Sequence, residues 1–396
     1  MTKQRPIFAA AAIGLALTAW LVVGSATAAF AAVVTGSAGG FSFSADDTNV
    51  AAGAQITGYT GPVGAVTIPN TVVIGATTYN VTSIGANAFQ NKSITAVTIP
   101  ATVTSISSGA FLQNQISTLT LPAGLTTIGN GAFSINHLVT VAIPAGITSI
   151  PFALFDGNDL TSVTFLGAPT AIGQSAFSNN DFTSFTIPDT VTSIGTNAFV
   201  QNTGLTSLTI PASVTSIGNT IVEGNVTQIL FAGAAPTTFT AAGATGSFGT
   251  ATGKTVSFHW AFGSPQTAGG FTTPTWNGYN TSAIVTVGFD MQGHGTAVAD
   301  QEFVSGGTAT QPAAPTAAGQ KFTGWFTSAA LTTPFDFAAP VTTDATAFAG
   351  WTSSGLAATG VTVSPLVIVI VFGVLILGVL LLLISRVRSR RSVPRG

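Results

Sequence analysis

The chain has 396 residues, of which 10 are basic, 12 are acidic and none is cysteine, so its formal net charge at pH 7 is -2. The absence of cysteine excludes a disulfide framework, a thiolate metal site and a thiol nucleophile. Stability must therefore come from packing and hydrogen bonds.

Residues 1–31 have the layout of a secretory signal peptide. Two basic residues near the start precede an uncharged apolar run from Pro6 to Val23, and small residues follow it. This order predicts removal of the segment by cleavage after Ala31, and cleavage after Ala28 fits nearly as well. An uncleaved membrane anchor is the alternative interpretation.

A phrase close to VTSIGTNAF recurs over residues 81–231. Its Ile recurs in five steps of 22 and one of 23, from Ile84 to Ile217, and a Phe stands five residues after the first six of these. A fixed period of this length with recurring apolar anchors predicts a solenoid. Residues 32–80 are expected to form its N-terminal cap and first strand.

Each repeat carries a second element with apolar residues at i, i+3 and i+5, and most copies end in Pro. These segments begin at Ile94, Ile116, Leu160, Phe182 and Leu205. The spacing is that of a leucine-rich repeat strand, which Pro ends because it lacks a donor for the next ladder position.

An asparagine also recurs three residues after Phe in five repeats. Side-chain amides stacked in this way can bind turn backbone from coil to coil, so we predict a structural ladder. Its members are Asn114, Asn136, Asn158, Asn180 and Asn202.

The repeated phrase, the Ala-Phe pairs and the strand-ending Pro residues together resemble the BspA-type leucine-rich repeat. The resemblance extends over Phe41–Trp276. It implies a mainly β, curved solenoid of parallel strands, in a secreted or surface protein that often attaches to other proteins or to matrix.

The outward positions of the predicted strands are rich in hydroxyl side chains. They are expected to form a stripe, because stacked strands lie about 4.8 Å apart. Threonine is a good polar strand former, so the stripe is either a solvated face or a broad contact surface for a protein or glycan; binding to ice or a crystal surface is a third interpretation. The candidate ligand residues are Thr118, Thr120, Thr140, Ser162, Thr164, Ser184, Thr186, Ser207 and Thr209.

Residues 232–283 are expected to form a C-terminal cap and linker, after which a new pattern begins. GGTATQPAAP, FTGWF, TPFDF and a terminal AGW follow in order within residues 284–351. This segment resembles the internalin-type B repeat, also called the Listeria-Bacteroides repeat, which implies a small β-grasp-like domain serving as spacer or contact module. Trp325 and Trp351 are predicted to pack in its core, with sugar stacking as the alternative, and His294 to lie in a solvated turn.

Residues 352–365 form a short linker that contains a pentapeptide. An unbroken apolar stretch follows over residues 366–384, long enough to cross a bilayer, and then an Arg-rich tail over residues 385–396 that is predicted to stay in the cytoplasm. The pentapeptide consists of Leu356, Ala357, Ala358, Thr359 and Gly360.

The pentapeptide, the apolar span and the tail resemble the cell-wall sorting signal of Gram-positive surface proteins. The resemblance implies that a sortase cuts between Thr359 and Gly360 and joins the Thr carbonyl to a peptidoglycan precursor. Ala357 stands where the commonest form has Pro, as in the variant of high-GC Gram-positive bacteria. The expected location is therefore the extracellular face, covalently attached to the wall, with a permanent single-pass membrane anchor as the alternative.

Removal of the signal peptide and of the residues after Thr359 leaves 3 Lys, no Arg and 12 acidic residues. The net charge of the remaining chain is 3 minus 12, or -9. Such a chain lacks the basic surface that nucleic acid requires, so no nucleic acid is expected among its partners. The remaining length leaves room for two domains.

No arrangement of side chains in the sequence predicts catalysis, a metal site or a cofactor. The three histidines, His137, His259 and His294, stand in different segments, and the close carboxylate pairs are expected in exposed turns. We therefore expect a surface protein, not an enzyme, that presents a solenoid for adhesion to a protein or glycan. The alternative is a structural component of the envelope without a foreign ligand.

Overall fold

The computed structural model describes residues 33–263 and 269–354, which fall into two compact units. The first comprises residues up to Ile229 together with Pro236–Lys254, and the second comprises Leu230–Ala235 together with the residues from Thr255 onward. The predicted signal peptide, sorting motif, membrane span and tail lie outside the described residues. Within those residues, no helix combines the length and hydropathy needed to cross a membrane.

The first unit opens with an antiparallel layer. β1 pairs with β2 and β2 with β3, all antiparallel, and β3 then pairs parallel with β6, to which β5 adds an antiparallel partner. An antiparallel layer covers the edge of the first coil, which a terminal coil of a solenoid requires. The elements are β1 (Val33–Ala38), β2 (Phe41–Asp46), the 3-10 helix η1 (Val50–Ala52), β3 (Ala54–Tyr59), β5 (Thr71–Ile74) and β6 (Thr77–Ile84).

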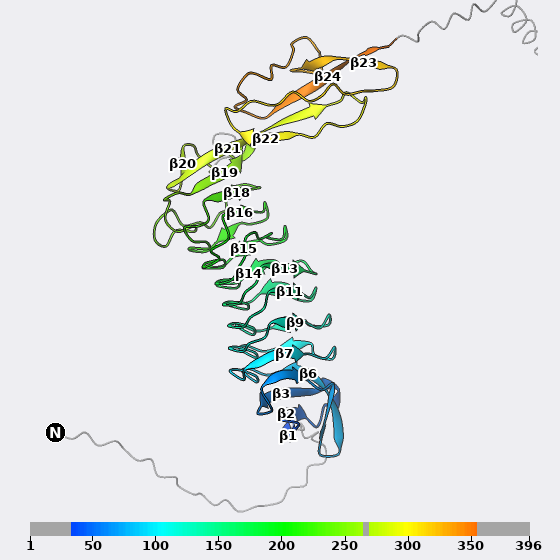
Figure 1. Ribbon diagram of the computed structural model, residues 1–396, viewed down its shortest axis with the longest axis vertical. Helices are drawn as coiled ribbons and strands as arrows, with labels where there is room; N and C mark the ends of the chain where they lie inside the picture. Colours follow the sequence, from blue (N-terminus) through cyan, green and yellow to red (C-terminus); the bar gives the residue numbers. More distant parts are fainter. Residues whose placement is uncertain (1–32, 264–268, 355–396) are drawn as a thin grey trace, which may run out of the picture. The chain divides into compact units, whose positions relative to one another are not determined.

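The predicted leucine-rich repeat strands form one row of parallel strands along the first unit (Figure 1). Where two neighbouring coils pair, each strand residue pairs with its equivalent in the next coil, as Thr118 does with Ala96 and Ser162 with Thr140. The parallel solenoid predicted from the period is therefore confirmed. The strands of this row are β4 (Gly64–Thr67), β7 (Ile94–Thr98), β9 (Thr118–Thr120), β11 (Thr140–Ile143), β13 (Ser162–Phe165) and β16 (Ser207–Ile210).

The prediction of a strand over residues 182–187 was wrong, since this segment has no regular strand. Phe182 and Phe185 instead pack against each other with ring centroids 5.0 Å apart, and Phe185 lies 4.7 Å from Phe199. We attribute the missing strand to these bulky rings, which occupy positions where other coils carry smaller aliphatic residues. The ladder is also interrupted between β9 and β11, so the row is not one continuous sheet.

A second row of two-residue parallel strands was not predicted. The Ser-Ile pair of the repeated phrase and its equivalents form this row, and each Ile is buried. Each Ile pairs with that of the next coil from β8 to β10 and from β12 to β17, and no strand pairing joins β10 to β12 within the described residues. In four of these coils a glycine follows this Ile and lies against the backbone of the preceding coil: a Cβ on Gly173 would lie 2.6 Å from the carbonyl oxygen of Ile150. The strands are β8 (Ser105–Ile106), β10 (Thr127–Ile128), β12 (Ser149–Ile150), β14 (Ala171–Ile172), β15 (Ser193–Ile194) and β17 (Ser216–Ile217).

The core of the solenoid is a stack of phenylalanine rings. The rings of Phe89 and Phe111 lie 4.9 Å apart and nearly parallel, and those of Phe111 and Phe133 lie 5.2 Å apart. The stack continues to Phe199 with steps of 6.0 or 6.1 Å, and all its members are buried. A period of 22 residues gives each ring the same neighbours, so one residue type suits the position in successive coils.

The predicted asparagine ladder is confirmed. All five asparagines are buried, and each side-chain amide links the turns of neighbouring coils. Asn136 is typical: its Oδ1 accepts from the backbone N–H of Ile116 at 3.1 Å, and its Nδ2 donates to the carbonyl oxygens of Phe111 at 3.0 Å and Phe133 at 3.1 Å. Asn225 extends the ladder by donating to the carbonyl oxygens of Asn202 and Leu205.

The second unit contains a four-stranded mixed sheet in the order β22-β21-β24-β23, where β21 pairs parallel with β24 and the other two pairs are antiparallel. At its other end β21 also pairs with β19 and β20. β18 (Gln228–Phe231) stands at the division between the units. The remaining elements are β19 (Thr255–His259), η2 (Trp260–Phe262), β20 (Thr275–Trp276), β21 (Tyr279–Asp290), β22 (Gln301–Val304), β23 (Gln320–Phe326) and β24 (Ala345–Ser353).

Candidate functional site

The nine predicted ligand residues all lie exposed on the first row of the solenoid, and we call this surface the hydroxyl face. Strand alternation explains the arrangement: in β16, Leu208 and Ile210 are buried while Ser207 and Thr209 face solvent. The structure therefore places these residues on one side of successive coils, including Ser184 and Thr186 in the segment that lacks a regular strand.

A second set of threonines has a different role, and we call it the threonine column. Its members occupy one position of successive coils, where Thr126 Oγ1 donates to the Thr104 carbonyl oxygen at 3.2 Å and Thr192 Oγ1 to that of Thr170 at 3.1 Å. Six such bonds link the column, which consists of Thr82, Thr104, Thr126, Thr148, Thr170, Thr192, Thr215 and Thr237.

The hydroxyl groups of the hydroxyl face, by contrast, form no hydrogen bond to the described part of the chain. Each hydroxyl has one donor and two acceptor sites. In the sequence, the hydroxyl face and the threonine column are both threonine-rich sets that recur with the repeat period. Only the coil-to-coil hydrogen bonds in the structure distinguish them. The hydroxyl face is the set whose hydrogen-bonding groups remain available to a partner.

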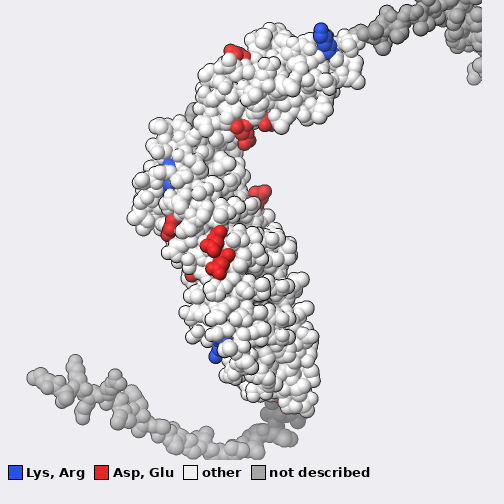
Figure 2. Space-filling model, in the orientation of Figure 1, with Lys and Arg blue, Asp and Glu red and all other residues white. Residues whose placement is uncertain are grey.

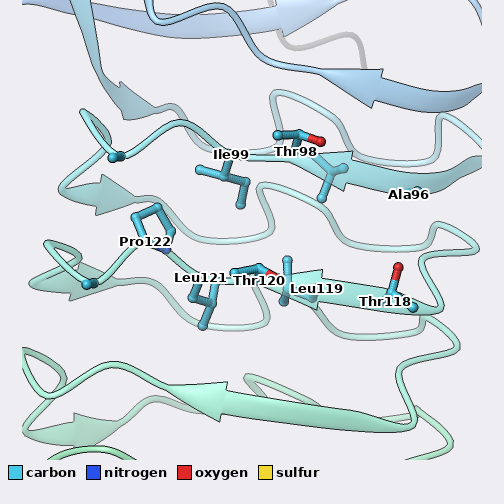
Figure 3. A pocket seen from close by; sticks show the side chains of 11 residues that line it. Ala96, Thr98, Ile99, Thr118, Leu119, Thr120, Leu121 and Pro122 are labelled. Atoms are coloured by element: carbon cyan, nitrogen blue, oxygen red, sulfur yellow. The ribbon is translucent and has the colours of Figure 1, made fainter.

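A groove of about 610 Å³ opens on the hydroxyl face at β7 and β9 (Figure 3). Thr98, Thr118 and Thr120 supply hydroxyl groups to it, and Leu121 and Pro122 supply apolar surface. The volume falls within the range of about 300–1,000 Å³ that is usual for ligand sites. No charged residue lines the groove.

Charged side chains are sparse on the face of the molecule that Figure 2 shows. None of the nine residues of the hydroxyl face is ionisable, and acidic side chains such as Asp156, Asp159 and Asp181 stand on the turns of the coils. A partner therefore meets an uncharged surface, on which hydrogen bonds and shape decide binding more than ionic attraction does.

The structure brings together one pair that the sequence analysis did not connect. His137 Nδ1 lies 3.0 Å from Asp159 Oδ2, with side chains that are 60% and 50% exposed. The separation of 22 residues equals the repeat period, so the two side chains occupy equivalent positions in adjacent coils. Exposed pairs of this kind contribute little to stability. Within residues 33–263 and 269–354 no group of three or more His, Asp and Glu side chains is suited to hold a metal.

Lys254 is a second residue that the sequence analysis did not single out. It is 1% exposed, and its Nζ donates to the carbonyl oxygens of Glu223 at 2.7 Å and Val226 at 3.2 Å. Burial lowers the pKa of the Lys254 ammonium, and the Glu223 carboxylate partly opposes this shift. These contacts tie the last segment of the first unit to the turn after β17, which is a structural role.

The predicted core positions of Trp325 and Trp351 are confirmed. Trp325 is 3% exposed within the hydrophobic cluster of the second unit, and Trp351 Nε1 donates to the Met291 carbonyl oxygen at 2.9 Å while its ring packs on Phe322. His294 lies in the turn after β21, and its ring is 5.8 Å from that of Trp351.

Comparison with known protein families identifies both repeated patterns. The family model of the BspA type leucine rich repeat region matches residues 73–181 and 170–231, with six copies. The model of the Listeria-Bacteroides repeat domain matches residues 286–350. The resemblances to the BspA-type leucine-rich repeat and to the Listeria-Bacteroides repeat are thereby confirmed.

Among solved structures, the chain is similar to a leucine rich cell surface protein of Faecalibacterium prausnitzii, at 26% identity over 50% of this chain and 70% of that chain, with a TM-score of 0.37. It is also similar to leucine-rich repeat proteins of Bacteroides ovatus, at 20% identity over 58% and 71% with a TM-score of 0.33, and of Bacteroides capillosus, at 28% identity over 34% and 99% with a TM-score of 0.27. No curated protein matches the chain.

Proposed function

We propose that this chain is a cell-wall-anchored surface protein whose solenoid binds a protein or glycan in adhesion. It carries a BspA-type leucine-rich repeat region over residues 73–231 and a Listeria-Bacteroides repeat domain over residues 286–350. The observation that carries the proposal is the difference between the two threonine-rich surfaces. The threonine column uses its hydroxyl groups to join coils, whereas the hydroxyl face leaves nine uncommitted.

The chemistry of the face suits a large, uncharged contact. Hydroxyl groups that are satisfied only by water can exchange that water for a partner without breaking an internal bond. The face has few aromatic anchors, so each contact is weak and affinity depends on many of them acting together. An extended partner that spans several coils fits this pattern better than a small molecule.

Wall anchoring is supported by the sequence of the C-terminal region. The motif from Leu356 to Gly360, the apolar span of residues 366–384 and the Arg-rich tail stand in the order that a sortase substrate requires. The partners during anchoring are the sortase and a peptidoglycan precursor, in a Gram-positive bacterium of the high-GC group. The C-terminal peptide of protein released by wall-digesting enzymes tests this: it ends at Thr359 with a wall fragment, whereas peptides beyond Gly360 would indicate a permanent membrane anchor.

The binding test replaces four hydroxyl groups near the end of the face by charged side chains. A variant with Ser184→Lys, Thr186→Lys, Ser207→Lys and Thr209→Lys is compared with the unchanged protein for binding to arrays of matrix proteins and of glycans. Because all four side chains are exposed, the fold is retained and far-UV circular dichroism is unchanged. The expected result is loss of the ligand that the unchanged protein captures.

A matched control carries the same added charge on the turns. Gln113→Lys, Gln115→Lys, Gln201→Lys and Thr203→Lys change four exposed side chains that lie off the hydroxyl face. This variant is expected to bind like the unchanged protein. Equal binding by the face variant and the unchanged protein would show that the face is not the contact surface.

A structural envelope component without a foreign ligand is the second candidate function. It is favoured by the short distance along the chain between the last strand and the sorting motif, since β24 ends at Ser353 and the motif begins at Leu356. Such a short connection gives no long stalk to lift the solenoid beyond the wall. Antibodies against the solenoid distinguish the two candidates on intact cells, because an adhesive face must be reachable and a component embedded in the wall is not.

A further inference from the structure

A groove in the second unit has a lining unlike that of the hydroxyl face. It lies beside β20, β21 and β22, which are adjacent in Figure 1, and has a volume of about 560 Å³. The volume again falls within the usual range for ligand sites of about 300–1,000 Å³. Its lining combines the indole of Trp260 with hydroxyl groups that include those of Thr281, Ser282, Ser305 and Thr342.

Trp260 is placed as a rigid, accessible aromatic surface. It begins η2, is partly exposed, and packs against the hydrophobic cluster that includes Val285 and Val287. Its indole N–H has no hydrogen-bond partner within the described residues. Trp325 is buried in the core, and Trp351 packs on Phe322 with its indole N–H bonded to the Met291 carbonyl oxygen, whereas Trp260 lines a surface groove.

The hydroxyl groups of the groove retain hydrogen-bonding capacity. Thr281 Oγ1 donates to the Thr272 carbonyl oxygen at 2.6 Å and Ser305 Oγ donates to that of Thr342 at 3.1 Å, which leaves the acceptor sites of both hydroxyls open. The hydroxyls of Ser282 and Thr342 form no bond to the described part of the chain. The groove therefore offers donors and acceptors beside the Trp260 indole and the aliphatic side chains of Pro274, Ala283 and Val304.

Among the described residues, no ionised group lines this groove. The nearby Asp344 carboxylate accepts from the backbone N–H of Thr286 at 2.9 Å and lies 3.5 Å from His259 Nε2, so its contacts are to the protein. An uncharged lining discriminates against ionic ligands, which would lose their hydration without compensation. The ligand must be neutral, with an apolar face for the indole and hydroxyl groups at its edges.

We propose that this groove is a binding site for a neutral saccharide, whose ring C–H face lies on the Trp260 indole and whose hydroxyl groups bond to the serine and threonine hydroxyls. A peptide is a poorer fit, because peptide anchors require well-packed apolar pockets, whereas here Trp260, Pro274, Ala283 and Val304 share the lining with five hydroxyl side chains. The groove shares no residue with the hydroxyl face, so an experiment can refute one of the two binding proposals and leave the other standing.

The test is titration of the full protein with cellohexaose, chitohexaose, maltohexaose and xylohexaose, followed by intrinsic tryptophan fluorescence and calorimetry. At least one oligosaccharide is expected to saturate the protein, and Trp260→Ala to weaken binding at least about tenfold. Thr342→Arg is a second variant that keeps the core unchanged, because this residue is exposed and its new side chain reaches over the groove. It is expected to weaken the same binding.

Thr343→Arg is the matched control, since Thr343 is exposed and adjacent in sequence but does not line this groove. It is expected to bind like the unchanged protein, as is the hydroxyl-face variant with four lysines. Three results would overturn the proposal: no saturation by any of the four oligosaccharides up to about 10 mM, binding that survives both Trp260→Ala and Thr342→Arg, or competition for the groove by uncharged peptides alone.

Discussion

Replacing Asn136 by alanine is expected to open the solenoid locally, because this one side chain bonds to four backbone groups. The amide is 4% exposed and accepts from the Ile116 N–H, and its two N–H groups donate to the carbonyl oxygens of Phe111, Phe133 and Ser134. Each of these carbonyls keeps another donor, from Asn114, Asn158 and the Gln113 N–H respectively, whereas the Ile116 N–H has no other acceptor within the described residues.

The magnitude follows from this difference. An orphaned buried N–H costs about 1–3 kcal/mol, and each lost bond whose acceptor keeps another donor costs about 0.5–1.5 kcal/mol. The orphaned Ile116 N–H and the two amide N–H groups of Asn136, which share three carbonyl acceptors, together give a loss of about 2–6 kcal/mol. Thr126→Ala is the matched control, since its exposed Oγ1 bond to the Thr104 carbonyl oxygen at 3.2 Å is readily replaced by water and its loss costs less than about 1 kcal/mol.

Urea unfolding followed by circular dichroism gives the change in the free energy of unfolding, and hydrogen exchange followed by mass spectrometry locates it. Peptides that cover residues 111–137 are expected to exchange faster in Asn136→Ala, since coils contact only their neighbours and the damage stays local. If Asn136→Ala and Thr126→Ala lose the same small amount, water replaces the amide without cost and the ladder does not hold the coils together.

Three further changes test other parts of the structure. Phe133→Ala removes a buried ring from the stack and is expected to cost about 3–5 kcal/mol in urea unfolding, and a loss below 1 kcal/mol would mean that neighbouring rings close the gap. His137→Ala is expected to change the free energy of unfolding by less than about 1 kcal/mol at pH 6 and at pH 8, because the pair with Asp159 is exposed. Burial lowers the pKa of Lys254 in the folded state below the 10.5 of the unfolded chain. At a pH between the folded-state and unfolded-state pKa, the unfolded state binds more protons than the folded state. The free energy of unfolding therefore rises with pH in this range. Unfolding midpoints from pH 8 to 10.5 are therefore expected to rise in the unchanged protein relative to Lys254→Met, and parallel curves would contradict the shift.

The sequence was sufficient to predict the repeating architecture, because one side chain type satisfies the same environment in successive coils. The asparagine ladder followed from spacing alone, as did the exposure of the nine hydroxyl residues. Period, strand pattern and turn chemistry agree with one another here, which is why local inference succeeded.

Tertiary structure decided what depends on contacts between coils or between distant segments. The rings of Phe182 and Phe185 replace a strand with irregular backbone, although their spacing fits the strand pattern. The threonine column differs from the hydroxyl face only in whether a neighbouring carbonyl lies within reach, and the groove at Trp260 joins residues up to 82 positions apart, since it also includes Thr342. Sequence period determines which residues are equivalent, whereas the geometry of packing determines which hydrogen bonds they make and which groups stay free for a partner.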